Sequence, residues 1–495
     1  MIIPTRAKRF ALTYVNYSKN KALNQAILMR IFLATFLLLV SVPSLAQDRY
    51  LIDWDKVGEE SLQHLVELIK INTTNPPGNE TLAANYLQAV LAAEGIDSQL
   101  YSLDSDRANM VARIKGNGSK RPILIMGHTD VVGVQADRWT EDPFGGLRKD
   151  GWVYGRGSLD DKDNATAGLM MMILLKRYGV ELDRDIIFLA ESGEEGTPEV
   201  GINFMVEKHW DLIDAEYCLA EGGSGILEDR GVSVVGVQTT EKMPRRVTLV
   251  ARGTAGHGSV PRIDNAVATL ARAVARADAW ETEMRLNETT KAYFERLATI
   301  SSPEDAFRYD NVANPEETEA IQQHFKETFP YHYSVLRTSV VPTIMNAGFR
   351  KNVIPSEATA MLDIRMLPDE NMEKFYAQLA EVMNEPNIEI VPEKIYRPAA
   401  PPSGIDNEMF ASIERAAGSM YPDAIVLPTM STGATDMAQV RAKGVSAYGI
   451  GPIRSIEELN SGNGVHSDNE RVSEEALVDF VKFMWTVVID IAASN

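Results

Sequence analysis

The sequence predicts an α/β protein with two parts. One is a catalytic domain whose mixed sheet has helices on both faces, and the other is a smaller α+β domain inserted into it. From residue 55 to about 240, short apolar runs of strand length alternate with segments of helical period. The pattern changes near residue 244 and resumes after about 395. A length of 495 residues also exceeds what one hydrophobic core usually organises.

The first part of the chain supplies the alternating pattern in order. Helical spacing of apolar residues predicts helices over 57–71 and 80–94. The run Pro122–Met126 predicts a strand, and a helix over 164–178 and a strand over 186–189 follow. Continuous apolar strands between helices are typical of a sheet buried on both faces.

The middle of the chain predicts a separate unit. Its expected elements are two helices and three strands, at 265–280 and 369–384, and at 246–250, 343–345 and 358–364. Residues 284–335 are polar and aromatic without a clear period, and we expect them to be an insertion with no assigned role.

The domain boundaries follow from these changes. We expect a signal peptide over 1–46, a catalytic domain formed by 47–243 and 396–495, and a lid or dimerisation domain over 244–395. The Pro-rich stretch 397–402 predicts the return linker, and an amphipathic helix over 473–491 ends the chain.

The N-terminus has the features of an export signal. An apolar run over 31–42 follows basic residues, and small residues precede an expected cleavage site after Ala46. Because the run is shorter than the ~20 residues that cross a bilayer, we expect no stable membrane anchor after cleavage. The basic leader over 1–28 is long for an export signal, and a start of translation at Met29 is the alternative hypothesis to a start at Met1. We expect a periplasmic or secreted protein.

Composition excludes several function classes. The net charge is −20, so capture of a nucleic-acid backbone, which needs clustered cations, is not expected. The single cysteine, Cys218, excludes an intramolecular disulfide and a cysteine-based metal site. A metal in this protein must therefore be held by His and carboxylate side chains.

Four ionisable clusters follow predicted strands. They are His128-Thr129-Asp130, Asp160-Asp161, Glu194-Glu195 and Glu221. Taken alone, each has an ordinary explanation: an incidental triplet, a helix cap, a solvated surface pair or a turn residue. Together they are expected at the carboxyl edge of one sheet, where ligands bind in such folds. Carboxylates facing one another there would repel unless a cation neutralised them, which predicts a metal site.

These motifs resemble peptidase family M20, the di-zinc metallohydrolases that include carboxypeptidases, aminoacylases and the deacylases of acetylornithine and succinyl-diaminopimelate. The resemblance covers essentially all of 50–490. It adds a late His466 in Gly464-Val465-His466-Ser467-Asp468 and a Gly-Arg-Gly motif before Asp160. It implies a fold of the zinc exopeptidase type with an inserted lid, and two Zn²⁺ per chain. Co²⁺ or Mn²⁺ also suits this ligand set.

The resemblance assigns roles to the clusters. His128 and Glu221 would bind one zinc, and Glu195 and His466 the other. Asp160 would bridge the two ions, and Asp130 would orient His128. Glu194 matches the general base that takes a proton from the attacking water.

The inserted unit carries further motif residues. His257 resembles the lid histidine that stabilises the tetrahedral oxyanion, often in the partner subunit's site, although a turn residue between glycines is the alternative. Asn352 and Arg365 resemble the residues that hold the substrate's carbonyl or carboxylate, although a surface ion pair would also explain Arg365. Gly433 and Thr435 lie in a loop that resembles the one near the substrate's free carboxylate.

Two departures from the family pattern limit the inference. Gly193 replaces the acid that usually precedes the Glu pair. Met437-Ala438-Gln439 lacks the nearby Arg of some aminoacylases, which argues against carboxylate recognition by that loop.

The function we expect is hydrolysis of an amide bond beside a free carboxylate by a carboxypeptidase or dipeptidase. An N-acyl-amino-acid amidohydrolase is the close alternative, and a non-catalytic binding protein on the same fold is the alternative of another class. The substrate would be a small peptide or an N-acyl amino acid. The resemblance also implies a homodimer formed through the lid domain.

Overall fold

The computed structural model describes residues 50–494. The predicted signal peptide, with its apolar run and cleavage site at Ala46, lies outside the described residues. In the described part of the chain, no helix combines the length and the apolar character that crossing a membrane requires.

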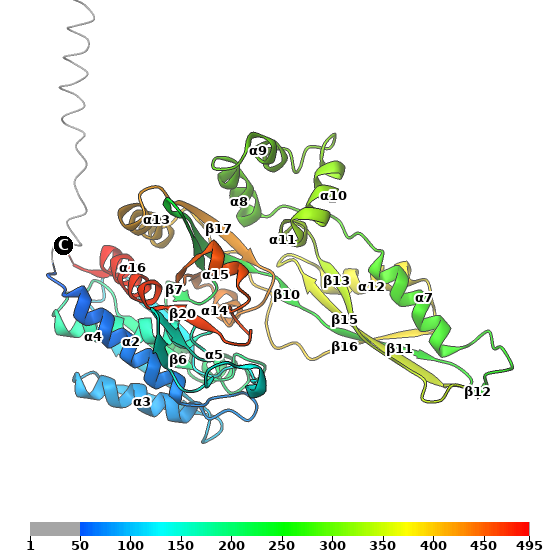
Figure 1. Cartoon of the computed structure of the whole chain (residues 1–495), viewed down its shortest axis with the longest axis horizontal. Coiled ribbons are helices and arrows are strands. Elements are labelled where there is room, and N and C mark those ends of the chain that lie inside the picture. The colour runs from blue at the N-terminus through cyan, green and yellow to red at the C-terminus, as the bar shows by residue number, and fades with distance from the viewer. Residues whose placement is uncertain (1–49, 495) are drawn as a thin grey trace, which may run out of the picture. The chain divides into compact units, whose positions relative to one another are not determined.

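The main sheet has ten strands in the order β1-β2-β6-β3-β7-β18-β9-β8-β19, with β17 beside β9. Figure 1 labels β6, β7 and β17 of this sheet. The bounds of the ten strands are Ser98–Ser102 (β1), Ala108–Ile114 (β2), Ile123–His128 (β3), Ile186–Glu191 (β6), Tyr217–Ala220 (β7), Ser224–Glu228 (β8), Gly231–Glu241 (β9), Ile425–Ser431 (β17), Ser446–Gly449 (β18) and Ile453–Ser455 (β19).

The centre of this sheet is parallel and buried on both faces. β3 pairs in parallel with β6 and β7, and every residue of β3 is buried. Antiparallel pairs, such as β1 with β2 and β8 with β9, lie toward the edges. The predicted mixed sheet is therefore confirmed. The register pairs His128 with Glu191, so the ends of β3 and β6 lie side by side.

Helices cover both faces of the main sheet. Leu124 and Met126 of β3 pack in the core formed with α5 (Ile202–Lys208), α6 (Trp210–Ile213) and α14 (Met437–Ala442). Ile125 points the opposite way, toward Gly168 of α4 (Lys162–Arg177), as the twofold period of a strand requires. α2 (Trp54–Lys70), α3 (Glu80–Ala93) and α16 (Glu474–Ala492) contact α4, and α13 (Glu408–Met420) contacts α16.

A separate three-stranded sheet carries the turn before α4. Its strands are β4 (Leu147–Lys149), β5 (Trp152–Tyr154) and β20 (Arg471–Ser473). The Asp160-Asp161 cluster follows β5, so it reaches the main sheet edge from this smaller sheet and not from the end of a central strand. The short helices η1 (Ala136–Arg138) and α15 (Ile456–Asn460) lie in connecting segments.

We call residues 244–395 the lid segment. The second large sheet lies in this segment, except that its first strand begins one residue earlier. β15 (Glu357–Met366) pairs with β10 (Met243–Pro244), β11 (Val247–Arg252) and β13 (Ser339–Ala347), and β11 pairs with β16 (Ile388–Pro392). The helices α7 (Ala266–Asp278) and α12 (Met372–Met383) share one core with this sheet. β12 (Gly256–His257) and β14 (Val353–Ile354) form a two-stranded ribbon.

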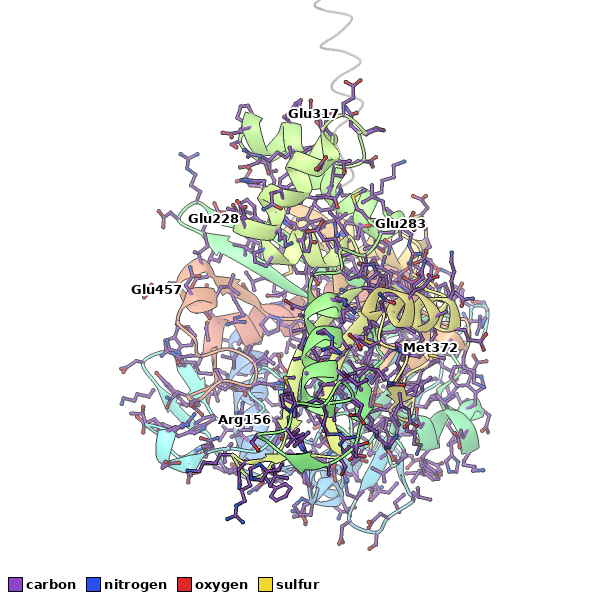
Figure 2. The ribbon with its side chains drawn as sticks, turned by 90° about the vertical axis from the view of Figure 1, so that its right-hand side faces the viewer. Arg156, Glu228, Glu283, Glu317, Met372 and Glu457 are labelled. Carbon is purple, nitrogen blue, oxygen red and sulfur yellow. The ribbon has the colours of Figure 1, made fainter. Side chains whose placement is uncertain are left out.

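The insertion folds into four short helices, which the sequence pattern did not reveal. They are α8 (Glu288–Ala298), α9 (Pro303–Asp310), α10 (Thr318–Thr328) and α11 (Pro330–Val335). Phe294 and Phe325 are buried in their common core, where the two rings stack with centroids 5.9 Å apart. In Figure 2 these helices are grouped around Glu317, while Met372 marks the start of α12.

Candidate metal centre and active site

The end of β3 places a histidine and an aspartate together. His128 is the last residue of β3 and is 1% exposed. Its Nδ1 lies 3.0 Å from the backbone oxygen of Asp130 and 3.5 Å from the Asp130 carboxylate. A hydrogen-bonded Nδ1 leaves Nε2 free to face a ligand. Both the carbonyl and the carboxylate of Asp130 therefore lie near the imidazole, and the orienting role of Asp130 stays a prediction.

Asp160 reaches two histidines at once. Its Oδ1 lies 3.0 Å from His128 Nε2, and its Oδ2 lies 3.1 Å from His466 Nε2. His466 Nε2 is also 2.7 Å from Glu195 Oε1. The structure thus brings together the predicted bridging carboxylate and ligands from both predicted metal positions.

A second cluster shares His128. Ligand atoms of His128, Glu194 and Glu221 lie within 4.8 Å of one another, as do those of His128, Asp160 and Glu195. Glu221 directly follows β7, and the Glu194-Glu195 pair lies in the turn after β6. All five predicted ligands and the predicted base therefore meet around His128 and His466, although their individual roles stay a prediction.

The electrostatics of this cluster fit a bound cation. Burial and the charge of Glu194 raise the pKa of Glu221 well above its usual range. Burial also raises the pKa of Glu194, although the nearby Arg397 acts in the opposite direction. Hydrogen bonds to Asp160 and Glu195 raise the pKa of His466 to about 10. Carboxylates with this much uncompensated charge are stabilised by divalent cations, and the donor set of histidine and carboxylate suits zinc.

Asp130 also holds the backbone of the turn after β6 that carries Glu194 and Glu195, which we call the catalytic turn. Its carboxylate oxygens accept hydrogen bonds from the backbone N–H groups of Glu194 and Glu195, at 3.1 and 3.0 Å. The Asn75 side chain donates to the same carboxylate at 2.8 Å and to the carbonyl of Glu195 at 3.0 Å. Sequence reasoning missed Asn75, whose only signal was its place in an Asn-Pro-Pro turn.

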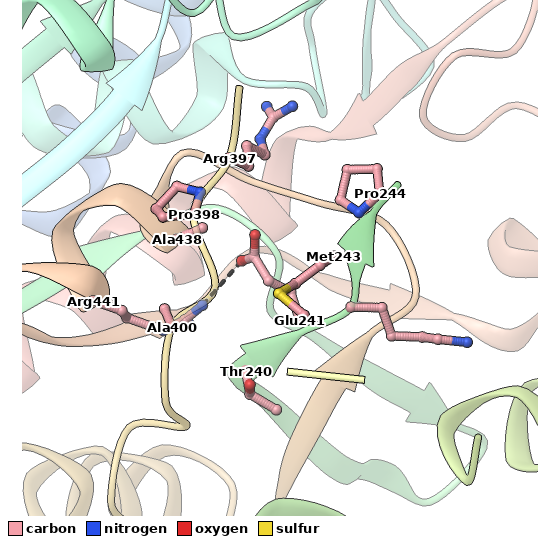
Figure 3. Close-up of a pocket in the computed structure, with 10 residues that line it drawn as sticks. Thr240, Glu241, Met243, Pro244, Arg397, Pro398, Ala400, Ala438 and Arg441 are labelled. Atoms are coloured by element: carbon pink, nitrogen blue, oxygen red, sulfur yellow. Dashed lines mark hydrogen bonds and ion pairs between the residues drawn. The ribbon is translucent and has the colours of Figure 1, made fainter. Parts of the chain in front are cut away.

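Arg397 is the second residue that sequence reasoning missed. Its Nη2 bonds the Glu194 carboxylate and lies 3.3 Å from Asp436 Oδ1, and its Nε donates to the Thr435 carbonyl at 3.2 Å. It belongs to the Pro-rich stretch that the sequence identified only as a linker. Figure 3 shows Arg397, Pro398 and Ala400 of this linker together with Glu241, whose ion pair with Arg441 is drawn as a dashed line.

The predicted lid residues lie apart from the cluster. His257 is exposed, and its Nδ1 lies 2.7 Å from Ser259 Oγ. Asn352 adjoins it, because the Asn352 carbonyl accepts from Gly258 N at 2.9 Å. Arg365 pairs with Asp363 of its own strand at 2.9 and 3.2 Å. Within residues 50–494 none of the three contacts the metal-ligand cluster.

A cavity of about 340 Å³ opens beside the cluster. Asp160 and Glu221 line it, and so do Gly433 and Thr435 from the loop after β17. The Thr435 hydroxyl donates to Glu241 at 2.7 Å, so this side chain already has a structural partner. The cavity is the space in which a substrate can meet the cluster.

The profile of the peptidase family M20/M25/M40 matches residues 124–490. The chain belongs to this family. As an M20 protein it is a hydrolase that acts on amide bonds, as the sequence predicted.

Two of the similar curated proteins are named for different substrates. The chain is 30% identical over 378 residues to a probable carboxypeptidase S-like 2 of Dictyostelium discoideum, covering 75% of this chain and 72% of that protein. It is 25% identical over 451 residues to the human N-fatty-acyl-amino acid synthase/hydrolase PM20D1, covering 87% of each.

Solved structures show the same fold. The M20 metallo-carboxypeptidase Sso-CP2 of Sulfolobus solfataricus aligns with a TM-score of 0.64 and 20% identity, over 87% of this chain and 99% of that one. The Bacillus subtilis YXEP protein, described as a dinuclear metal-binding peptidase from the M20 family, aligns with a TM-score of 0.56 and 14% identity, over 88% and 98%. The M20 fold of this chain thus includes the inserted unit.

Proposed function

We propose that this M20 hydrolase holds two zinc ions and cleaves an amide bond next to a free carboxylate, as a carboxypeptidase or dipeptidase. The observation that carries the proposal is the meeting of His128, Asp160, Glu195, Glu221 and His466 beside a cavity. The dinuclear site described for a structural relative of the same fold supports the ion count.

Each side chain of the site has a separate proposed role. Glu194 is the proposed general base, which takes a proton from the attacking water and passes it to the leaving amine. Bound zinc would polarise the scissile carbonyl and lower the pKa of water. Asp130 keeps Glu194 and Glu195 in place through their backbone N–H groups. Asn352, His257 and Arg365 of the lid segment are proposed to reach the substrate or, in trans, the partner subunit's site.

Hydrolysis of N-acyl amino acids is the second candidate. The similarity to an N-fatty-acyl-amino acid synthase/hydrolase over 87% of both chains supports it. The similarity to a probable carboxypeptidase supports the peptide substrate. Both substrate classes share an amide bond beside a carboxylate, so the same site can serve either.

A substrate panel tests the proposal. Residues 47–495 would be assayed against dipeptides and N-acyl amino acids, with and without a chelator, beside Glu194→Gln as the inactive control. We expect chelator-sensitive cleavage by the wild type, with the preferred half of the panel naming the subclass. Cleavage that survives both the chelator and Glu194→Gln would refute the metal-dependent mechanism.

We also propose a homodimer formed through the lid segment. β13 pairs with β15 alone among the described strands, so its other edge is open. Val341, Ile344 and Met345 of β13 are each about half exposed, at 51%, 51% and 49%. Light scattering should give twice the monomer mass for the wild type and the monomer mass for Ile344→Lys. A monomeric wild type would end this proposal.

Export to the periplasm or the medium remains a proposal that rests on the sequence alone. The apolar run over 31–42 and the small residues before the expected cleavage site support it. N-terminal sequencing of the protein from its native host should begin at Gln47. A product that retains residues 29–46 would contradict cleavage.

A further inference from the structure

Arg454 stands out among the side chains of the catalytic cavity. It lies on β19 and is the one Lys or Arg among the described residues that line the cavity holding Asp160 and Glu221. Asp163 is a further acid in this lining. A substrate carboxylate that enters between these acids therefore meets a single cationic side chain.

The guanidinium of Arg454 lies against Gly464, in the loop that carries the predicted ligand His466. A Cβ added to Gly464 would lie 3.0 Å from Arg454 Nη2 and 3.5 Å from Nη1. Gly464 precedes His466 by two residues. Because Gly464 has no side chain, the Arg454 guanidinium can lie against the backbone of the loop that carries His466, a predicted metal ligand.

Arg454 has no acidic partner in the described part of the chain. Glu458 and Glu470 act on it only through charge at longer range, and burial lowers its pKa. Both acids are already engaged. Glu458 accepts from the backbone of Ser455 at 2.7 Å, and Glu470 pairs with Arg156 at 2.5 Å. Because arginine does not lose its proton, a partly buried guanidinium in this state favours an external anion.

The other arginines considered for this role already have acidic partners. The fork of Arg365 is already bonded to both oxygens of Asp363. Arg397 is bonded to Glu194 and Asp436. No arginine directly follows Asp436, where Met437, Ala438 and Gln439 begin α14, and Arg441 of that helix pairs with Glu241 at 2.9 Å. Arg454 is left as the guanidinium that faces the cavity with its donors free.

We propose that Arg454 binds the free carboxylate of the substrate and so determines the specificity of the enzyme for acids over their amides. This proposal rests on the proposed function, because it assigns the carboxylate of that substrate to a residue. The planar fork of arginine pairs with two carboxylate oxygens at once, whereas a carboxamide offers one acceptor and no charge.

The test compares an acid with its amide. Kinetics would be measured for the best substrate of the panel and for its C-terminal carboxamide, with the wild type, Arg454→Gln and Arg454→Lys. Arg454→Gln should raise KM for the acid about 10- to 100-fold, the effect of losing charge-assisted hydrogen bonds, and change KM for the amide less than about 2-fold. The KM of Arg454→Lys for the acid should lie between those of the wild type and Arg454→Gln, because lysine carries a charge but lacks the planar fork of donors.

Arg471→Gln is the matched control. Arg471 lies 4.2 Å over the Trp152 ring and donates to Tyr154 at 3.0 Å, and it is absent from the cavity lining. Its replacement should leave the ratio of acid to amide unchanged. Equal effects of Arg454→Gln on acid and amide, or no effect on either, would overturn the proposal.

A binding measurement separates this proposal from the proposed function. Calorimetry would compare N-acetylleucine with its carboxamide on Glu194→Gln protein, with and without Arg454→Gln. A selective loss of acid binding in the double variant supports the role of Arg454 even where the wild type cleaves nothing in the panel. Unchanged acid binding refutes that role, whether or not the enzyme is active.

Discussion

Asp130→Asn tests whether one buried carboxylate organises the catalytic turn. The side chain is 0% exposed and accepts three hydrogen bonds, from the N–H groups of Glu194 and Glu195 and from Asn75. An asparagine has the same shape but only one acceptor oxygen. If the asparagine oxygen occupies the position of Oδ2, it still accepts from Glu195 and Asn75. The side-chain NH₂ group then occupies the position of Oδ1 and faces the N–H of Glu194, so that this hydrogen bond is lost.

The cost follows from these bonds. A hydrogen bond to a charged group contributes about 1.5–3 kcal/mol and a neutral one about 0.5–1.5 kcal/mol. Losing one charged bond and weakening two others from charged to neutral gives a destabilisation of about 5 kcal/mol. Because the same change releases the neighbours of His128, metal affinity should also fall about 10- to 100-fold.

Urea unfolding of the metal-free protein and metal titration would measure the two effects. Asp229→Asn, an exposed aspartate in the turn between β8 and β9, is the control and should change neither. A destabilisation below about 1 kcal/mol for Asp130→Asn, with metal affinity unchanged, would refute the reasoning that these bonds hold the turn.

The remaining predictions concern the linker and the insertion. Arg397→Gln should lower kcat about 10-fold while the metal content stays unchanged, because Glu194 loses its cationic partner; metal analysis beside kinetics measures this, and an unchanged kcat would contradict it. Burial lowers the pKa of His332 to about 4, so the unfolded state binds more protons between pH 4 and 6.5 and stability falls as the pH drops through this window. When the pH falls from 7 to 4.5, the free energy of unfolding of His332→Phe should drop by about 2 kcal/mol less than that of the wild type, as measured by urea unfolding. Equal drops in the two proteins would contradict a lowered pKa of His332.

Much of the fold was predictable because strong periodicity marks it. The expected helix over 473–491 is α16 at Glu474–Ala492, and the expected strand over Pro122–Met126 is β3 at Ile123–His128. The helices of the insertion could not be predicted from hydrophobic periodicity. Its helices are short, and their buried residues are aromatic side chains that meet across helices, as Phe294 and Phe325 do.

The metal-ligand cluster was predictable because strand ends meet at one edge of a sheet. The Asp160 turn reaches that edge from β5 of a different sheet, which a strand pattern cannot distinguish. Asn75 and Arg397 were not predictable. They lie 55 and 203 residues along the chain from Asp130 and Glu194, which they bond, so only the folded chain creates these contacts.

Metal stoichiometry tests the central claim most directly. Plasma emission analysis of residues 47–495 should give about two divalent ions per chain for the wild type. Glu221→Gln and His466→Ala, which remove ligands predicted for different ions, should each retain about one. A wild type without metal, or variants that keep the full wild-type content, would contradict a two-ion centre built from these side chains.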